Sequence, residues 1–465
     1  MLSHKKSSQK SKRLHSRHGQ LTAPKHTLDQ DERSPRDAYE LVHDEMFFDA
    51  NPRLNMASFV TTWMEPEAAK LMTESFDKNL IDKPIYPQTL EIQNRCVSIL
   101  ADLYHADHDS AGTGTVGSSE AIHLAGLVMK WNWKTWYQEK YGQDAPLKPN
   151  IIMGSNVQVC WEKFARYFDV DLIEIPLKQN NLLDEEAAIA AVDDNTIGVV
   201  GILGNTYSGE FDDIAKMDKL IDKNNAENGR QVPLHVDAAS GGGVAPFTDE
   251  HKDIVWDFRL KWVKSINMSG HKYGLVYPGL GWAIWKSKSL IPQDLIFNVE
   301  YLGESQEDFG LNFSRGAGQI IAQYYNFVRY GREGYSRIMN NLMDLYHELK
   351  PKVEGLKNAD GVKIFDLVSH DKGLPLICVS VTAEAARLGY KMATISHRSR
   401  ERGWVFPVYP MSAPKQDLTV MRMVLKEGFN SEMGDKMIED LQWAIDEILK
   451  ERKELKSGHG RYGTC

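Results

Sequence analysis

Between residues 60 and 345, short apolar runs of strand length alternate with amphipathic segments of helix length. Strands that alternate with helices are joined by crossover connections and form a mostly parallel sheet. The predicted strands are residues 151–154, 172–176, 197–203, 233–237 and 265–268, and the predicted helices are residues 120–137, 161–168 and 214–224. We therefore expect an α/β large domain whose ligands bind beyond the carboxyl ends of its strands.

The length of 465 residues is more than one hydrophobic core usually organises, so a second, smaller domain is expected. Residues 315–358 have the helical period over one long helix or two, and the last 105 residues have an α+β pattern. The predicted strands there are residues 362–365 and 376–381, and the predicted helices are residues 383–388 and 432–456. We predict an N-terminal segment with a basic tail (residues 1–57), a large domain (58–345) and a small C-terminal domain with a flexible tail (346–465).

Charge and composition exclude several classes of protein. The net charge is −9 and the pI is about 6.0, which argues against a nucleic-acid-coating protein. The longest apolar stretches have the length of a strand, so no integral membrane association is expected. The four cysteines form no CxxC pair, which favours neither zinc nor disulfides and is typical of the cytoplasm.

The first 20 residues carry six Lys or Arg and three His but no acidic residue. This segment is either a solvated tail or a pH-sensitive arm whose histidines charge in acid and contact a membrane or a partner subunit.

The motif SGHKY at residues 269–273 follows a predicted buried strand. A lysine at such a strand end loses hydration, which lowers its pKa from about 10.4 and leaves a neutral amine that attacks an aldehyde. Lys272 is therefore a candidate to hold pyridoxal 5'-phosphate (PLP) as an imine. The alternative is an ordinary surface lysine.

A second motif, HVDAASGG at residues 235–242, lies 35 residues earlier. A carboxylate at the end of an apolar strand is costly unless it is paired, and the protonated ring nitrogen of PLP is a suitable partner. Asp237 is the candidate for that role, and Ala239 would face the ring. A metal-binding or helix-capping aspartate is the alternative.

The third motif, GTGTVGSSE at residues 112–120, contains GxGxxG. A dinucleotide site requires a strand before the glycines, and residues 106–111 are too polar to form one. We instead expect a glycine-rich turn in which Ser118 and Ser119 open a helix and hold a phosphate. The alternative is an ordinary helix N-cap at Ser118.

These motifs, in this order, resemble the fold-type I PLP enzymes and, among them, the group II amino acid decarboxylases. The resemblance narrows to the bacterial glutamate decarboxylases and covers about residues 35–430. It rests on NMASF (55–59), IDK (81–83), GSSE (117–120), VQVCW (157–161), NTYSG (205–209), HVDAA (235–239), residues 265–272 and NFSR (312–315).

The resemblance implies further roles in binding the cofactor. Gln158 would stack on the ring, Thr206 would bind near the ring hydroxyl or the substrate carboxylate, and Ser269 and His271 would contact the phosphate. Ser314 would reach the phosphate from a neighbouring subunit. With Lys272 and Asp237, His271 completes the expected catalytic residues.

The resemblance also implies a substrate pocket formed by Ser58, Phe59 and Asp82, with Arg422 paired to the α-carboxylate. The segment 301–306 would form a loop beside the site. His459 in the C-terminal tail would close the site when the pH rises, unless that tail is simply frayed. The expected assembly is a homo-oligomer, at least a dimer, with shared active sites.

The activity implied is PLP-dependent decarboxylation of L-glutamate to 4-aminobutyrate and CO2, which consumes a proton and suggests a role in acid resistance. The alternatives are a PLP decarboxylase or lyase acting on another amino acid, such as aspartate or cysteine sulfinate, and a non-catalytic PLP-binding assembly protein. A cluster at residues 105–109 (HADHD) has the composition of a metal site, but its polar loop lacks a paired motif, so no metal is expected.

Overall fold

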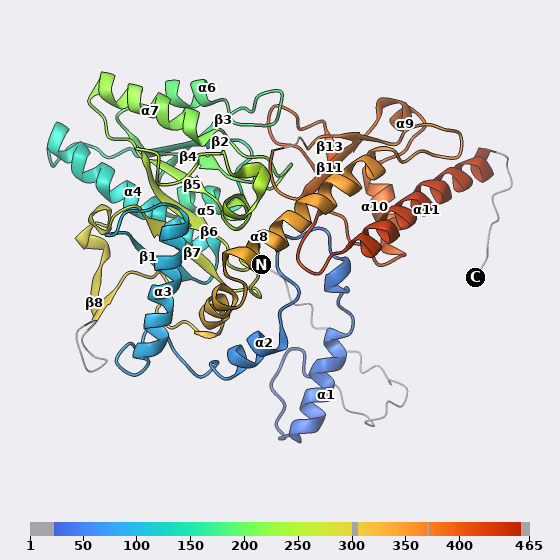
Figure 1. The fold of residues 1–465 in the computed structure, drawn as a ribbon, viewed down its shortest axis with the longest axis horizontal. Coiled ribbons are helices and arrows are strands. Elements are labelled where there is room, and N and C mark those ends of the chain that lie inside the picture. Colours follow the sequence, from blue (N-terminus) through green and yellow to red (C-terminus); the bar gives the residue numbers. More distant parts are fainter. Residues whose placement is uncertain (1–22, 300–305, 370–371, 457–465) are drawn as a thin grey trace. The chain divides into compact units, whose positions relative to one another are not determined.

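A computed structural model describes residues 23–299, 306–369 and 372–456 (Figure 1). The chain divides into two compact units, one ending at Pro52 and the other beginning at Arg53. In the first unit, helix α1 (Pro35–Met46) begins after Ser34, whose Oγ accepts a hydrogen bond from the backbone N–H of Asp37 at 3.1 Å. The domain boundaries at residues 57 and 345 stay predictions.

The second unit contains a seven-stranded sheet in the order β1-β7-β6-β5-β4-β2-β3. Five strands are parallel, and β7 and β1 are antiparallel to their neighbours. The strands are β1 (Ala111–Thr115), β2 (Asn150–Gly154), β3 (Asp171–Ile175), β4 (Thr196–Ile202), β5 (Leu234–Asp237), β6 (Val263–Met268) and β7 (Gly281–Trp285). The α/β prediction with a mostly parallel sheet is confirmed.

Helices connect these strands and pack against the sheet (Figure 1). They are α4 (Ser118–Tyr141), α5 (Val159–Tyr167), α6 (Glu185–Ala190) and α7 (Ile214–Asn228), with α2 (Pro66–Thr73) and α3 (Pro87–Leu103) preceding the sheet. All seven residues of β4 are buried, as expected for a strand covered on both faces.

The glycine-rich segment at residues 112–120 was predicted to be a turn, but most of its glycines lie in a strand. Residues Ala111–Thr115 form the edge strand β1, paired with β7, and only Val116 and Gly117 turn the chain into α4. A Cβ at Gly112 would lie 2.8 Å from the carbonyl oxygen of Ala283, so this glycine allows close strand packing. The prediction of a turn was therefore wrong for residues 112–115, whereas residues 106–110 form no strand before the glycines, as expected.

The C-terminal part forms a four-stranded antiparallel sheet in the order β10-β11-β13-β12. Its elements are β10 (Phe365–Leu367), β11 (Leu376–Val381), α9 (Ala383–Arg387), α10 (Met392–Arg400), β12 (Val408–Pro410), β13 (Thr419–Val424) and α11 (Ser431–Lys456). The strand predicted at residues 362–365 begins only at Phe365, because Val362 donates its backbone N–H to the side chain of Asn358 in a local turn.

The expected long helix is α8 (Gly318–Glu354), which is kinked at Gly331 where φ is 56°. A short hairpin of β8 (Phe297–Val299) and β9 (Gln306–Asp308) precedes it. Among the described residues, no helix is long and apolar enough to cross a membrane.

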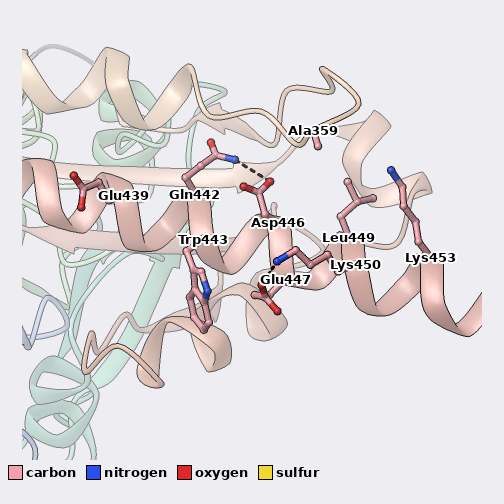
Figure 2. A pocket seen from close by; sticks show the side chains of 9 residues that line it. All are labelled: Ala359, Glu439, Gln442, Trp443, Asp446, Glu447, Leu449, Lys450 and Lys453. Carbon is pink, nitrogen blue, oxygen red and sulfur yellow. Dashed lines mark hydrogen bonds and ion pairs between the residues drawn. The ribbon is translucent and has the colours of Figure 1, made fainter. Parts of the chain in front are cut away.

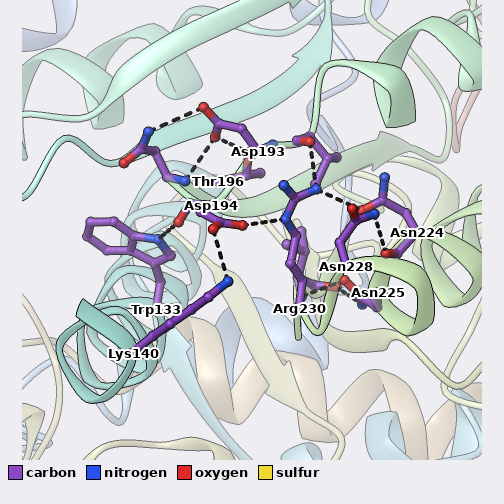
Figure 3. A network of polar contacts seen from close by, with 12 residues as sticks. Trp133, Lys140, Asp193, Asp194, Thr196, Asn224, Asn225, Asn228 and Arg230 are labelled. Carbon is purple, nitrogen blue, oxygen red and sulfur yellow. Dashed lines mark hydrogen bonds and ion pairs between the residues drawn. The ribbon is translucent and has the colours of Figure 1, made fainter.

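A polar network lies where β4 begins (Figure 3). The Asp194 carboxylate accepts hydrogen bonds from Arg230 Nε at 2.6 Å and Lys140 Nζ at 2.9 Å, and its backbone carbonyl accepts from Trp133 Nε1 at 2.9 Å. These contacts link the ends of α4 and α7 to the amino end of the sheet. The network therefore supports the fold at the edge opposite the carboxyl strand ends.

A surface pocket of about 620 Å³ is lined by Ala359 and eight side chains of α11 (Figure 2). None of these residues belongs to the motifs that predict chemistry, and the cavity is open to solvent. The candidate site lies instead beyond the carboxyl ends of β5 and β6.

Candidate active site

Lys272 follows the carboxyl end of β6 in a tight turn, where its backbone N–H donates to the carbonyl of Ser269 at 3.1 Å. Its Nζ donates to Ser240 Oγ at 3.3 Å and lies 5.3 Å from the centre of the Phe59 ring. Burial lowers the pKa of the Lys272 amine, the charge of Asp237 opposes this effect, and the charge of Arg422 adds to it. The arrangement favours the neutral amine, which is the nucleophilic form.

Asp237 ends β5 and is 5% exposed. Its Oδ1 accepts hydrogen bonds from Asn267 Nδ2 at 3.0 Å and from the backbone N–H of Ala239 at 3.2 Å. Its Oδ2 accepts from the indole Nε1 of Trp161 at 3.0 Å. Three N–H donors therefore hold the carboxylate in one orientation, and their favourable charge interaction offsets part of the cost of burying it.

The turn at Gly117 requires a glycine on the neighbouring strand. A Cβ at Gly281 of β7 would lie 2.4 Å from the carbonyl carbon of Gly117, so the backbones approach closely here. Ser118 follows this turn at the start of α4, and its Oγ accepts from Asn267 Nδ2 at 2.6 Å. The amino end of a 24-residue helix is thus exposed to the same region as Asp237.

His271 lies beside this turn, since a Cβ on Gly117 would be 3.4 Å from its Cε1. Its Nδ1 accepts from the backbone N–H of Leu280 at 3.2 Å, and burial together with the charge of Lys272 lowers its pKa to about 4. Ser269 is fully buried, and its Oγ has no hydrogen-bond partner in the described part of the chain. A buried hydroxyl without a partner beside a helix N-terminus fits a phosphate group that would accept its hydrogen bond.

Arg422 comes from β13 of the C-terminal sheet and is half-buried. Its guanidinium donates to the backbone carbonyls of Thr206 and, at 2.7 Å, of Ala57. The guanidinium carbon lies 5.0 Å from the centre of the Phe59 ring, and the buried Nε has no hydrogen-bond partner among the residues that the structure describes. Lys272 and Arg422 therefore share one aromatic neighbour, and Arg422 retains a donor for an anion.

The matched family model is the pyridoxal-dependent decarboxylase conserved domain, over residues 25–382. The chain belongs to the pyridoxal-dependent decarboxylase family. It is 48% identical to glutamate decarboxylase 5 of Arabidopsis thaliana over 91% of this chain and 83% of the plant protein. It is 43% identical to the glutamate decarboxylase of Lactococcus lactis strain IL1403 over 93% of this chain and 91% of that protein.

Among solved structures, a glutamate decarboxylase of Lactobacillus brevis matches this decarboxylase with a TM-score of 0.86 and 42% identity, covering 91% of this chain and 95% of that chain. The prediction of a fold-type I PLP decarboxylase resembling glutamate decarboxylases is confirmed, with plant as well as bacterial relatives. PLP is the cofactor of this decarboxylase family.

Other predicted site residues of this decarboxylase have local partners. Ser58 Oγ accepts from Asn55 at 3.3 Å. Gln158 caps α5, with its Oε1 accepting from the backbone N–H of Cys160 at 2.7 Å. Cys160 is close enough to Lys272 and Asp237 to interact electrostatically with both, which places the Gln158 turn beside them. Ser119 is exposed, and Thr206 contacts Arg422 through its carbonyl.

Asp82 and Ser314 lie in a second group around Asn79. The backbone N–H of Asp82 donates to the carbonyl of Asn79 at 3.1 Å, and Ser314 Oγ accepts from Asn79 Nδ2 at 3.4 Å. Among the described residues, no hydrogen bond joins Asp82 or Ser314 directly to Lys272. The predicted loop at 301–306 falls outside the described residues except for Gln306, which begins β9, and His459 falls outside them entirely.

Sequence reasoning assigned no role to Trp161, His235 or Asn267, although all three are fully buried at the site. The spacing of His235 to Asp237 contains a clue, because side chains two residues apart on a strand share one face. The hydrogen bond from Trp161 has no such local pattern. In the cluster at residues 105–109, His105 Nδ1 lies 2.9 Å from the carboxylate of Asp257. Within the described ranges, no group of three His, Cys, Asp or Glu residues is placed to hold a metal.

Proposed function

We propose that this decarboxylase removes the α-carboxylate of L-glutamate to give 4-aminobutyrate and CO2, taking up one proton per turnover. The supporting relatives at 43–48% identity are glutamate decarboxylases over about nine tenths of this chain. The observation that carries the proposal is the placement of Lys272 and Arg422 against Phe59, at 5.3 and 5.0 Å. This proximity supports a site in which the amine would hold the cofactor and the guanidinium would bind a carboxylate.

PLP, when bound, supplies an electron sink for the electrons of the breaking bond between Cα and the carboxylate. Lys272 would hold its aldehyde carbon, Asp237 would hold a proton at the ring nitrogen, and Ala239 and Gln158 would flank the ring. The residues that would hold the phosphate are Ser118, Ser119, Ser269 and His271. A serine hydroxyl, a protonated ring nitrogen and the backbone N–H groups at a helix N-terminus can each donate a hydrogen bond to a phosphate.

Arg422 would bind the α-carboxylate and, with Thr206, orient the bond that breaks. Its unpartnered Nε and half-buried position suit a bidentate contact to a carboxylate. Ser58 and Phe59 would contact the substrate side chain from the same chain. Lys272, or a group that it positions, would return a proton to Cα after CO2 leaves.

Asp82 and Ser314 would complete the site of a second copy of this chain in a homo-oligomer, at least a dimer. The surface around them carries large exposed apolar side chains, namely Phe76, Ile85, Val116 and Phe313. Such a patch is typical of a subunit interface. Sedimentation at dilute concentration tests this: a monomer with full activity would contradict the shared site.

Proton consumption suggests a role in acid resistance, carried out in the cytoplasm. Three of the four cysteines, Cys96, Cys160 and Cys378, lie in the described part of the chain, where they are free and buried, which suits a reducing compartment. Activity that is greatest at neutral or alkaline pH and vanishes near pH 5 would contradict the role in acid resistance.

The decisive experiment measures CO2 release from glutamate, aspartate, cysteine sulfinate and aromatic amino acids, with and without added PLP. We expect glutamate to dominate. The Lys272→Ala variant should lose activity and covalent cofactor, whereas Lys286→Ala, a half-buried lysine that donates to Leu260, should keep both. Retained decarboxylation in Lys272→Ala would overturn the proposal, and another preferred substrate would change it to a different amino acid decarboxylase. A cofactor absorbance band without turnover would indicate a non-catalytic PLP-binding protein.

A further inference from the structure

Four buried polar side chains form two adjacent cross-strand pairs on one face of β5 and β6. The parallel register pairs His235 with Ser265 and Asp237 with Asn267. Because side chains two residues apart on a strand point the same way, all four face the same side of the sheet. His235 and Asn267 are 0% exposed, Ser265 is 3% exposed and Asp237 is 5% exposed.

Hydrogen bonds determine the orientation of the Asn267 amide. Its Nδ2 donates to Asp237 Oδ1 at 3.0 Å and to Ser118 Oγ at 2.6 Å, which uses both of its protons. Its Oδ1 lies 2.8 Å from His235 Nε2, and His235 Nδ1 lies 2.8 Å from Ser265 Oγ. A flipped amide would place its oxygen against the Asp237 carboxylate, so Nε2 of His235 carries the proton and Ser265 donates to Nδ1.

This orientation has a consequence for Ser118. Its Oγ accepts a hydrogen bond from Asn267, so its own proton points elsewhere and is available to an anion at the N-terminus of α4. One side-chain amide thus links the first residue of that helix to the carboxylate at the end of β5. These are the two positions proposed to hold the phosphate and the ring nitrogen.

We propose that Asn267 is a positioning residue that sets Ser118 as a hydrogen-bond donor to the cofactor phosphate while it holds Asp237 toward the ring nitrogen. The inference rests on the roles proposed above for Ser118 and Asp237. His235 and Ser265 act through Asn267 by holding its amide in the donating orientation. If Asn267 had only a structural role, it would stabilise the sheet but would not link the phosphate contact of Ser118 to the ring-nitrogen contact of Asp237.

The test is a double-mutant cycle on PLP affinity, measured by titrating PLP into protein from which the cofactor has been removed. Asn267→Asp replaces both donors by acceptors and places a carboxylate against Asp237. We expect it to weaken PLP binding about ten- to a hundredfold, and Ser118→Ala to weaken it about tenfold. When Ser118→Ala is added to Asn267→Asp, it should weaken binding by less than about a further twofold, because in the Asn267→Asp variant Ser118 already donates to the carboxylate at position 267 instead of the phosphate.

The matched control is Asn225→Asp. Asn225 is also a buried asparagine, 4% exposed, that donates to and accepts from the backbone of Val232, outside the site. Its substitution should lower the melting temperature and leave PLP affinity unchanged. If Asn267→Asp does not fold, Asn267→Ser, which keeps one hydroxyl donor, replaces it in the cycle with a smaller expected loss.

Unchanged PLP affinity in the Asn267 variant, or independent effects of the two substitutions, would overturn the inference. An unaffected Ser118→Ala variant would also overturn it, because the phosphate role of Ser118 would then be absent. None of these outcomes bears on substrate choice, since PLP affinity is measured without an amino acid. A failure of glutamate decarboxylation with the expected cycle intact would count against the proposed function only.

Discussion

The indole Nε1 of Trp161, on α5, donates a 3.0 Å hydrogen bond to Oδ2 of Asp237, at the end of β5. Both side chains are buried, and the Trp161 ring also packs edge-on against His235 at a centroid distance of 5.3 Å. A helix is therefore tied to the carboxylate on which the proposed ring-nitrogen contact depends. The cost of burying this aspartate is offset by donors from α5, from β6 and from the turn after β5.

Trp161→Phe keeps most of the apolar volume and removes the N–H donor. We expect kcat to fall about tenfold and the free energy of unfolding to fall by about 1–3 kcal/mol, because a buried carboxylate loses a partner. Steady-state kinetics and urea unfolding check this. Trp133→Phe, which removes the bond to the Asp194 carbonyl, should cost stability while kcat is unchanged. Equal kcat values for both variants would contradict the role of Trp161.

Arg422→Lys keeps a positive charge but removes the planar guanidinium. We expect kcat/KM for glutamate to fall about a hundredfold, mainly through a higher KM, because an ammonium does not make the same paired contact to a carboxylate. PLP absorbance should be unchanged. Arg402→Lys, which alters an arginine stacked 4.2 Å from the Trp443 ring, is the control and should keep both constants. An unchanged KM in Arg422→Lys would show that another residue binds the carboxylate.

Lys426→Met should stabilise the protein. Lys426 is 5% exposed, donates to the carbonyl of Val60 at 3.3 Å, and burial lowers its pKa to about 8. Because the unfolded chain binds this proton more tightly, the contribution of Lys426 to stability is least favourable below about pH 8 and improves as the pH increases toward 10.5. At pH 7 the variant should gain about 1–3 kcal/mol in urea unfolding, and the gain should shrink at pH 9.5.

The surface variant Lys436→Met is the control for that experiment. Lys436 lies 3.0 Å from Asp440 and is largely exposed, so its loss should change stability by less than about 0.5 kcal/mol. A Lys426→Met protein that is less stable than wild type at pH 7 would mean that the charged amine is better solvated than its burial indicates.

Acid should destabilise the cofactor-free protein through its buried histidines. Burial lowers the pKa of His271 to about 4, from a usual value near 6.5, so the folded state favours neutral imidazole. The unfolded chain takes up the proton first, and stability present above pH 6.5 is lost as the pH falls toward 4. Urea midpoints at intervals of half a pH unit should fall across this range, less steeply in His271→Gln.

His123, His235 and His251 also have pKa values lowered by burial, so His271→Gln should reduce the slope without removing it. His347→Gln alters a histidine that pairs with Glu250 at 2.8 Å on the surface and serves as the control. A slope that is the same in His271→Gln and wild type would show that His271 is not buried in its neutral form.

The sequence indicated candidate site residues where a reactive or charged side chain directly follows an apolar run of strand length. Lys272 and Asp237 were predicted to be site residues because each is a polar residue near the end of an apolar strand. In the structure they lie at the ends of neighbouring strands of one sheet. The turn predicted over the glycines is instead strand β1, because glycines that suggest a turn in isolation also permit an edge strand to pack closely on β7. Arg422 has the pattern of a surface charge, and only its resemblance to related decarboxylases indicated a role.

By itself, the sequence determined the α/β order, the lysine proposed to hold PLP and the family, because these depend on local periodicity and on motifs within a few residues. Only the tertiary structure decided that Trp161 and Asn267 hold Asp237, and that Arg422 lies with Lys272 against Phe59. Those relations join residues that are 30 to 363 positions apart. They arise from the parallel register of β5 and β6 and from the packing of β13, and no pattern along a single segment encodes either of them.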